Sequence, residues 1–196
     1  MGYTHYWRRP RRLPKAAFAR VVSDLTTILP TLAASDVVLA GFNGEGEAVI
    51  SAKEIGFNGA RACGHSENTA IGMRWTATDA NGAVQSDQEA ISVRGLTGKT
   101  FTARVCDGDC SYETFLFSQT FEPLAWQVPE DGRYFEFCKT ARRPYDLAVT
   151  ACLVIAKHHF RDLIRVTSDG EPVNWQDAML LCQLELGYGM GFRLDE

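Results

Sequence analysis

The chain has 196 residues, enough for one domain with a sizeable core, and its 45% apolar and 22% charged residues are ordinary for a soluble globular protein. Its formal net charge of −4 argues against a general nucleic-acid coat, and no apolar run approaches the roughly 20 residues that a membrane-spanning helix needs. Positions 1–20 nevertheless hold six of the 20 basic residues and no acid, which indicates a local basic segment.

The chain opens with an aromatic tract that predicts a first strand at residues 2–7. Pro14 suits the first position of a helix, because its missing amide would have no partner there. Apolar residues then recur at the spacing of one helical face, and Pro30 predicts that this helix ends or bends near Leu29.

The middle of the chain is rich in turn signals. Short strands are expected at 37–42 and 48–57, each closed by an Asn-Gly pair. Residues 61–111 hold few large aliphatic side chains and several Gly-containing turns, so we expect a β-rich insertion there. Within it, 92–96 and 99–105 predict a hairpin.

The last third predicts the rest of the core. The patterns indicate, in order, a half-buried strand, an aromatic patch, a strongly apolar helix, a strand and a final helix at 112–121, 134–137, 144–158, 164–167 and 174–186. The order of elements predicts a single α+β domain over 1–196, with a mixed or antiparallel sheet, about three helices and the insertion.

Six cysteines indicate a reduced, cytoplasmic chain, since no hydrophobic signal segment precedes them and two lie in apolar helical patterns. Four residues of the insertion, Cys63, His65, Cys106 and Cys110, are compatible with a structural zinc site or with no metal at all. His65 and Glu67 with the two later cysteines match the zinc deaminases poorly, because three residues and not two separate those cysteines. The sequence leaves zinc undecided and names no cofactor.

Three cations stand directly before the apolar helix. Lys139, Arg142 and Arg143 would meet the amides of a helix N-terminus there, a combination suited to a phosphate or carboxylate. The alternative is an internal pair in which Arg142 or Arg143 holds an acid such as Asp146 or Glu113.

Acid–base candidates are few. His5 and Glu113 are the groups that we expect beside the cations, although Glu113 is equally suited to an ion pair. Cys138 would be a nucleophile only if a base such as His5 lay close by, and an inert buried thiol is the favoured interpretation.

Five motifs carry a resemblance to a family: MGYTHYW at 1–7, FNG at 57–59, ETF at 113–115, FCKTARRPYD at 137–146 and SDG at 168–170. With them the chain resembles a family of small uncharacterised proteins found mostly in tailed bacteriophages and prophages. Two features depart from its pattern: residues 61–111 separate the second motif from the third, and Tyr112 stands where the family usually has His. The resemblance implies a phage context, in the host cytoplasm, and no activity.

The first functional hypothesis is a phage-encoded accessory protein that binds a nucleotide or another phosphorylated ligand in a polar pocket. The acid–base pair would be His5 and Glu113, and the ligand-binding set comprises Tyr3, Tyr6, Trp7, Asn58, Lys139, Arg142, Arg143 and Tyr145. Hydrolysis and sequestration both remain open. The hypothesis requires the opening strand and the cationic helix entrance to be neighbours in space.

Two alternatives belong to other classes. A protein-interaction module, such as an inhibitor of a host defence enzyme, would use residues 61–111 as its binding surface. A nucleic-acid binder would use the basic segment within residues 1–20, with affinity that falls steeply with salt. No membrane partner is expected.

Overall fold

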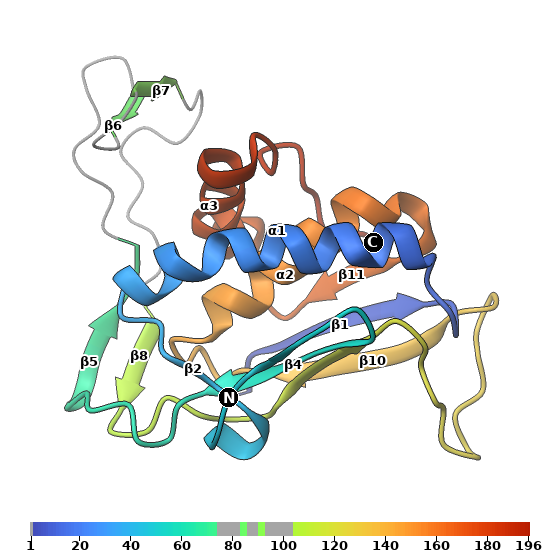
Figure 1. Cartoon of the computed structure of the whole chain (residues 1–196), viewed down its shortest axis with the longest axis horizontal. Coiled ribbons are helices and arrows are strands. Elements are labelled where there is room, and N and C mark those ends of the chain that lie inside the picture. The colour runs from blue at the N-terminus through green and yellow to red at the C-terminus, as the bar shows by residue number, and fades with distance from the viewer. Residues whose placement is uncertain (1, 74–82, 86–89, 93–103) are drawn as a thin grey trace.

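The computed structural model describes residues 2–73, 83–85, 90–92 and 104–196. Three α-helices and several antiparallel sheets confirm the predicted α+β class. The helices gather on one side and the principal strands on the other, with the small pair β5–β8 beside them (Figure 1).

The first sheet has the order β10-β1-β11 and is antiparallel throughout. Its strands are β1 (Thr4–Arg9), β10 (Tyr134–Lys139) and β11 (Arg165–Ser168). The central strand therefore comes from the beginning of the chain and both of its neighbours from the last third. His5 lies opposite Cys138 on one side and Ser168 on the other.

A second group of strands forms around β4 (Glu54–Gly59), which pairs with β2 (Leu39–Ala40), β3 (Val49–Ile50) and β9 (Phe115–Ser118). Two further antiparallel pairs are β5 (Glu67–Ile71) with β8 (Arg104–Asp107) and β6 (Ala83–Gln85) with β7 (Ala90–Ser92). Short 3-10 turns occupy Phe42–Gly44, Arg161–Leu163 and Pro172–Trp175.

The helices are α1 (Lys15–Ala34), α2 (Asp146–Phe160) and α3 (Gln176–Leu186). The middle helix, α2, packs against both others and is buried on almost every side, which explains its continuous apolar sequence. In α1 the buried residues recur at helical spacing, as the sequence predicts.

Aromatic side chains join the helices to the sheets. Phe115 and Phe117 are fully buried, which confirms the face predicted from their alternation. Phe117 stacks on Phe18 of α1 with ring centroids 6.1 Å apart, and Phe115 lies 5.3 Å from Trp7 of β1. Trp7 is thereby a core residue at the junction of the two main sheets.

Helix α1 continues through Pro30, so it does not end near Leu29, the first of the two predicted outcomes; the other, a bend, stays a prediction. Pro30 and Thr26, whose carbonyl loses its helical donor, are both on the exposed side, while Ile28 and Leu32 remain buried. Packing of that buried face outweighs the missing hydrogen bond.

By length and composition α1 is the one helix among the described residues that could cross a membrane, a feature that the sequence analysis overlooked. Its apolar face, including Phe18, Val21 and Leu25, is buried in the core against the rest of the chain. That packing is the behaviour of a core helix.

One further prediction needs correction. The single strand expected at 48–57 is a hairpin of β3 and β4. The final helix expected at 174–186 is α3 from Gln176 onward, preceded by the 3-10 turn Pro172–Trp175, in which the Asn174 side-chain oxygen accepts the amide of Glu171 at 2.9 Å. The hairpin expected from 92–96 and 99–105 falls almost wholly on residues 93–103, which lie outside the described residues.

Candidate functional site

The opening strand and the cationic helix entrance are neighbours, as the first hypothesis requires. Thr4 pairs with Lys139, and the carbonyl of Tyr3 accepts the amides of Thr140 and Ala141 at 2.9 and 3.2 Å. The guanidinium carbon of Arg142 lies 4.4 Å from the centre of the Tyr3 ring. The two clusters therefore form one surface.

Arg142 is presented by a strained backbone. Ala141 and Arg142 have φ values of 50° and 56°, in the left-handed region that side-chain-bearing residues rarely adopt. The Ala141 amide is tied to Tyr3, and the Arg142 carbonyl accepts the amide of Val105 at 3.2 Å. The guanidinium itself is exposed and has no ion-pair partner among the described residues.

Beneath this surface lies a buried ionic network centred on Asp146, at the start of α2. Its carboxylate accepts hydrogen bonds from the Thr140 hydroxyl, from His5 Nε2 at 2.6 Å and from Arg104 Nε at 2.7 Å. Arg104 also donates to Asp177 of α3 through both terminal nitrogens. No member of this network is more than 3% exposed.

The charges explain why these groups are ionised although buried. Burial alone would raise the pKa of Asp146, but Arg104 and His5 outweigh it and hold this pKa well below its usual value. Burial alone would lower the pKa of Arg104, and Asp177 with Asp146 raises it above its usual value. The network thus joins β8, α2 and α3 through charges that depend on one another.

Both ring nitrogens of His5 have partners within the protein. Its Nδ1 lies 3.0 Å from the Ser168 hydroxyl, and its Nε2 contacts Asp146. The order serine, histidine, aspartate resembles a hydrolytic relay, but the Ser168 hydroxyl also accepts the Gly170 amide at 2.9 Å and so supports the turn after β11. His5 has no exposed surface and links β1, β11 and α2.

A small cavity connects the surface to the network. It has a volume of about 10 Å³, and Tyr3, Arg104, Arg142, Asp146 and Asn174 line it. Such a volume holds about one water molecule. A nucleotide cannot enter it, so a ligand anion would lie outside, against Arg142.

Three predicted ligand-binding residues hold the fold. Trp7 packs on the phenylalanines of β9, and the buried Tyr145 donates its hydroxyl to the Glu113 carbonyl at 2.6 Å. Asn58 is buried and brackets the backbone of Tyr112, donating to its carbonyl and accepting its amide at 3.0 Å each. None of the three presents a free face to a ligand in this structure.

Glu113 and His5 are not paired. The Glu113 carboxylate accepts the backbone amide of Lys139 at 2.8 Å and so holds the end of β10, whereas His5 contacts Asp146 and Ser168. Among the described contacts none joins the two candidates.

The remaining cations keep part of their charge available. The Lys139 amine lies over the Tyr112 ring at 5.4 Å, and Arg143 approaches the half-exposed Asp107 at 3.6 Å. Asp146, one of the acids expected as an internal partner of Arg142 or Arg143, is instead bound by Arg104. The role of Arg104 was not predicted, because the residues around it suggested an exposed insertion. Its only signal in the sequence is its position two residues before Cys106.

Tyr6 lies on the opposite face of β1 from His5. Its hydroxyl donates to Asp169 at 2.9 Å, and its ring stacks on Phe135 at 5.8 Å. Tyr3 is therefore the predicted stacking residue that lies beside Arg142.

At least three of the six basic residues in 1–20 are engaged within the fold. Arg8 pairs with Glu130 and Arg11 with Glu122, while the buried Arg9 donates to backbone carbonyls near β9. These contacts reduce the charge that this segment could offer to nucleic acid.

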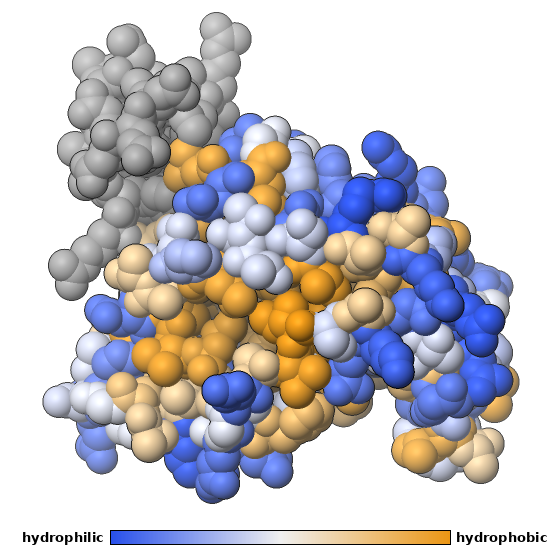
Figure 2. All heavy atoms as spheres, viewed as in Figure 1, coloured by the Kyte–Doolittle hydropathy of each residue, from blue (hydrophilic) through white to orange (hydrophobic). Residues whose placement is uncertain are grey.

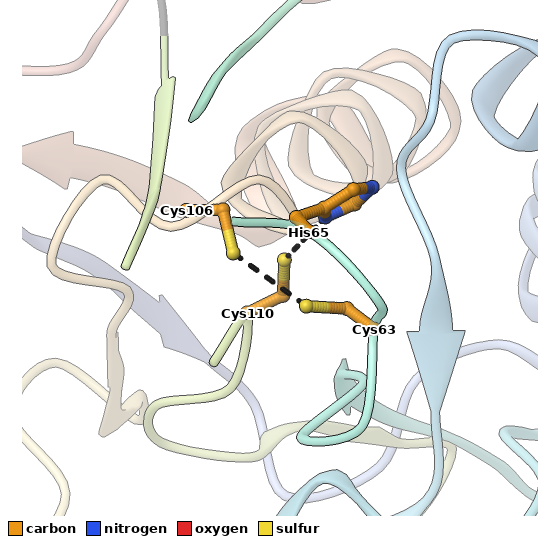
Figure 3. A group of neighbouring side chains, drawn as sticks. All are labelled: Cys63, His65, Cys106 and Cys110. Carbon is orange, nitrogen blue, oxygen red and sulfur yellow. Dashed lines mark hydrogen bonds between the residues drawn. The ribbon is translucent and has the colours of Figure 1, made fainter. Parts of the chain in front are cut away.

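The fold brings together the Cys63–His65–Cys106–Cys110 cluster (Figure 3). Cys63 Sγ lies 3.5 Å from Cys106 Sγ, and His65 Nδ1 lies 3.2 Å from Cys110 Sγ. The four potential ligand atoms all lie within 4.8 Å of one another. Cys138 lies elsewhere in the core, where burial raises its pKa far above the usual value and favours the inert thiol.

A larger cavity of about 380 Å³ lies between α2 and the end of the chain. Its lining includes Lys157, His158, Gln183, Tyr188 and Phe192. The Lys157 amine is already bound to Asp195 at 2.7 Å, and the His158 ring stacks on Tyr188 with centroids 3.6 Å apart. No sequence motif indicates this cavity.

Comparison with protein-family models, curated proteins and solved structures finds no match for this chain. The geometry described above is therefore the basis of the functional proposals.

Proposed function

We propose that the protein binds a phosphorylated ligand, such as a nucleotide, at a surface site centred on Arg142. The observation that carries this proposal is the exposed Arg142 guanidinium, stacked on Tyr3 and held there by a strained backbone. Lys139 and Arg143, on the same loop and strand end, add positive charge.

The backbone strain supports a role in binding. Two consecutive residues with positive φ cost on the order of 1–3 kcal/mol each, and such strain concentrates at ligand sites. The Arg142 guanidinium carbon lies over the Tyr3 ring at 4.4 Å, and a planar guanidinium can donate two parallel hydrogen bonds to a phosphate.

The proposal is for binding or sequestration of the ligand. Both ring nitrogens of His5 are bonded inside the protein, and the Glu113 carboxylate is bonded to the Lys139 amide, so neither group faces Arg142 as a free acid or base. Asp146 already occupies the first turn of α2, so the guanidinium and not the helix end would provide the main attraction.

Calorimetric titration with nucleoside mono-, di- and triphosphates and with inorganic phosphate tests the site. We expect Arg142→Ala to weaken binding by roughly 10- to 100-fold, the effect of losing charge-assisted hydrogen bonds. Arg12→Ala removes another exposed arginine and should leave the affinity unchanged. Failure of the wild type to bind any of these compounds, or equal affinity in Arg142→Ala, would reject the proposal.

The resemblance noted in the sequence supports a phage-encoded accessory role, and we propose the host cytoplasm as its compartment. The six cysteines are all free, which fits a reducing environment.

Protein interaction is a second candidate, favoured by the connection between β9 and β10. Leu124, Trp126 and Val128 are 59, 74 and 82% exposed there, which is unusual for large apolar side chains. The surface first expected at 61–111 is less suitable as a detachable module, because β8 within it supplies Arg104 to the core.

A capture experiment with bacterial host lysate distinguishes this candidate from ligand binding. We expect a specific partner to be retained by the wild type and by Arg142→Ala but lost from a Trp126→Ser, Val128→Ser double variant. Capture that is unchanged in the double variant would exclude this surface.

A further inference from the structure

The Cys63–His65–Cys106–Cys110 cluster is assembled from two short turns that are far apart in the sequence. Cys63 and His65 precede β5, whereas Cys106 lies in β8 and Cys110 just after it. A glycine with positive φ stands within each turn, Gly64 at 80° and Gly108 at 77°, and lets the chain reverse between two ligands. In Figure 3 the three sulfur atoms point toward one another and the His65 ring lies beside Cys110.

The spacing fits a single ion. Tetrahedral zinc with bonds of about 2.3 Å to sulfur places its sulfur ligands about 3.8 Å apart. The Cys63–Cys106 separation is 3.5 Å, and no two of the four ligand atoms are more than 4.8 Å apart. Three thiolates with one imidazole form one of the usual ligand sets of structural zinc sites.

We propose that Cys63, His65, Cys106 and Cys110 bind one structural zinc ion. This site is separate from the proposed anion site and does not depend on it. Four protein ligands complete the tetrahedral shell and leave no position for a substrate, which distinguishes a structural zinc from a catalytic one.

The zinc would fix β8 in place. Buried and exposed residues alternate along β8, so Cys106 and Arg104 point to the same side, toward the core. The Cys110 amide donates to the Ala60 carbonyl at 3.2 Å, and a Cβ at Gly59 would collide with the Cys110 carbonyl. Zinc would thereby hold β8 against the end of β4, with Arg104 between its two carboxylates.

The test is elemental analysis of the full chain after purification and after reconstitution with zinc alone. We expect one zinc per chain in the wild type, loss of zinc in Cys63→Ser and in Cys106→Ser, and full retention in Cys182→Ala. Cys182 is a suitable control because it is fully buried in α3, outside the cluster.

Cobalt substitution of the wild type supplies a measurement that needs no variant. Tetrahedral thiolate coordination should give intense ligand-field absorption that equimolar zinc abolishes. A wild type without stoichiometric metal after reconstitution would overturn the proposal. So would a disulfide between cluster cysteines in freshly purified protein, detected by mass spectrometry, or undiminished zinc in Cys106→Ser.

Discussion

Asp146 is the single side chain on which most of the buried polar contacts converge. One carboxylate receives a histidine, a hydroxyl and a guanidinium that come from β1, the end of β10 and β8. A buried charge of this kind is stable only while its partners remain, because each partner replaces water that the carboxylate has lost. The residue therefore controls whether three distant segments can pack together.

Replacing Asp146 by Asn keeps the shape and removes the charge. We expect a loss of about 3–5 kcal/mol in the free energy of unfolding, measured with urea, because the buried Arg104 keeps one carboxylate instead of two. Glu122→Gln removes an exposed acid paired with Arg11 and should change stability by less than about 1 kcal/mol. Similar losses in both variants would contradict the central position of Asp146.

Comparison of wild type with Asp146→Asn also gives a prediction for the pH dependence of stability. The folded pKa of Asp146 is depressed, so the stability that its charge contributes is complete above the unfolded value of about 4. It is lost progressively as pH falls below that value toward the folded pKa. The stability difference between wild type and Asp146→Asn should therefore narrow between about pH 5 and pH 3; a constant difference would contradict the depressed pKa.

Cationic and aromatic motifs were enough to predict that the opening strand and the cationic helix entrance lie side by side. They could not show that His5 and Trp7 are buried, because burial depends on strand direction and on which face the helices cover. Arg104 was beyond reach, since its partners lie 42 and 73 residues further along the chain.

At the level of elements, α1 shows how tertiary packing overrides local propensity. Interior proline is less favourable than alanine by about 3 kcal/mol, yet the helix continues to Ala34 because Ile28 and Leu32 stay in the core. The helix therefore carries an unfavourable residue that its packing compensates.

Pro30→Ala should stabilise the protein. Alanine restores an amide donor for the Thr26 carbonyl and removes the proline ring, and both changes favour the folded state. The unfolded chain becomes more flexible, which offsets roughly 0.4–1 kcal/mol of the gain in the free energy of unfolding. We expect a net increase of about 1–2 kcal/mol in urea unfolding, with little change in Thr27→Ala, an exposed position of the same helix. Destabilisation by Pro30→Ala would mean that the proline supports a bend that the core requires.

Strand identity was easier to predict than strand pairing. Alternation along β9 gave its buried face correctly, whereas 48–57 divided into two strands and β8 paired with β5 across a long separation. Local periodicity records which side of a strand is buried, and pairing is decided by contacts that no short window contains.

At the scale of the whole molecule, strand β8 connects the proposed zinc site to the buried ionic network. Arg104 and Cys106 lie two residues apart on β8. Arg104 is bound to α2 and α3, while Cys106 belongs to the Cys63–His65–Cys106–Cys110 cluster. Removing the metal should therefore destabilise the helical layer as well as the small β5–β8 sheet.

A chelator strong enough to remove zinc should lower the melting temperature of the wild type by roughly 10 °C, which corresponds to about 4 kcal/mol for a chain of this length. Calorimetry with and without chelator measures the shift. Cys63→Ser, already free of metal, should melt at the same temperature in both conditions. An unchanged wild-type transition after confirmed loss of zinc would show that the ion and the fold are independent.

The central position of β1 has a consequence for how the protein is made. Its two hydrogen-bonded neighbours begin at Tyr134 and Arg165, so a nascent chain cannot complete this sheet until most of it has left the ribosome. Pairing across more than 120 residues also carries a high loop-closure cost, which makes incorporation of β1 into its sheet a late step of folding.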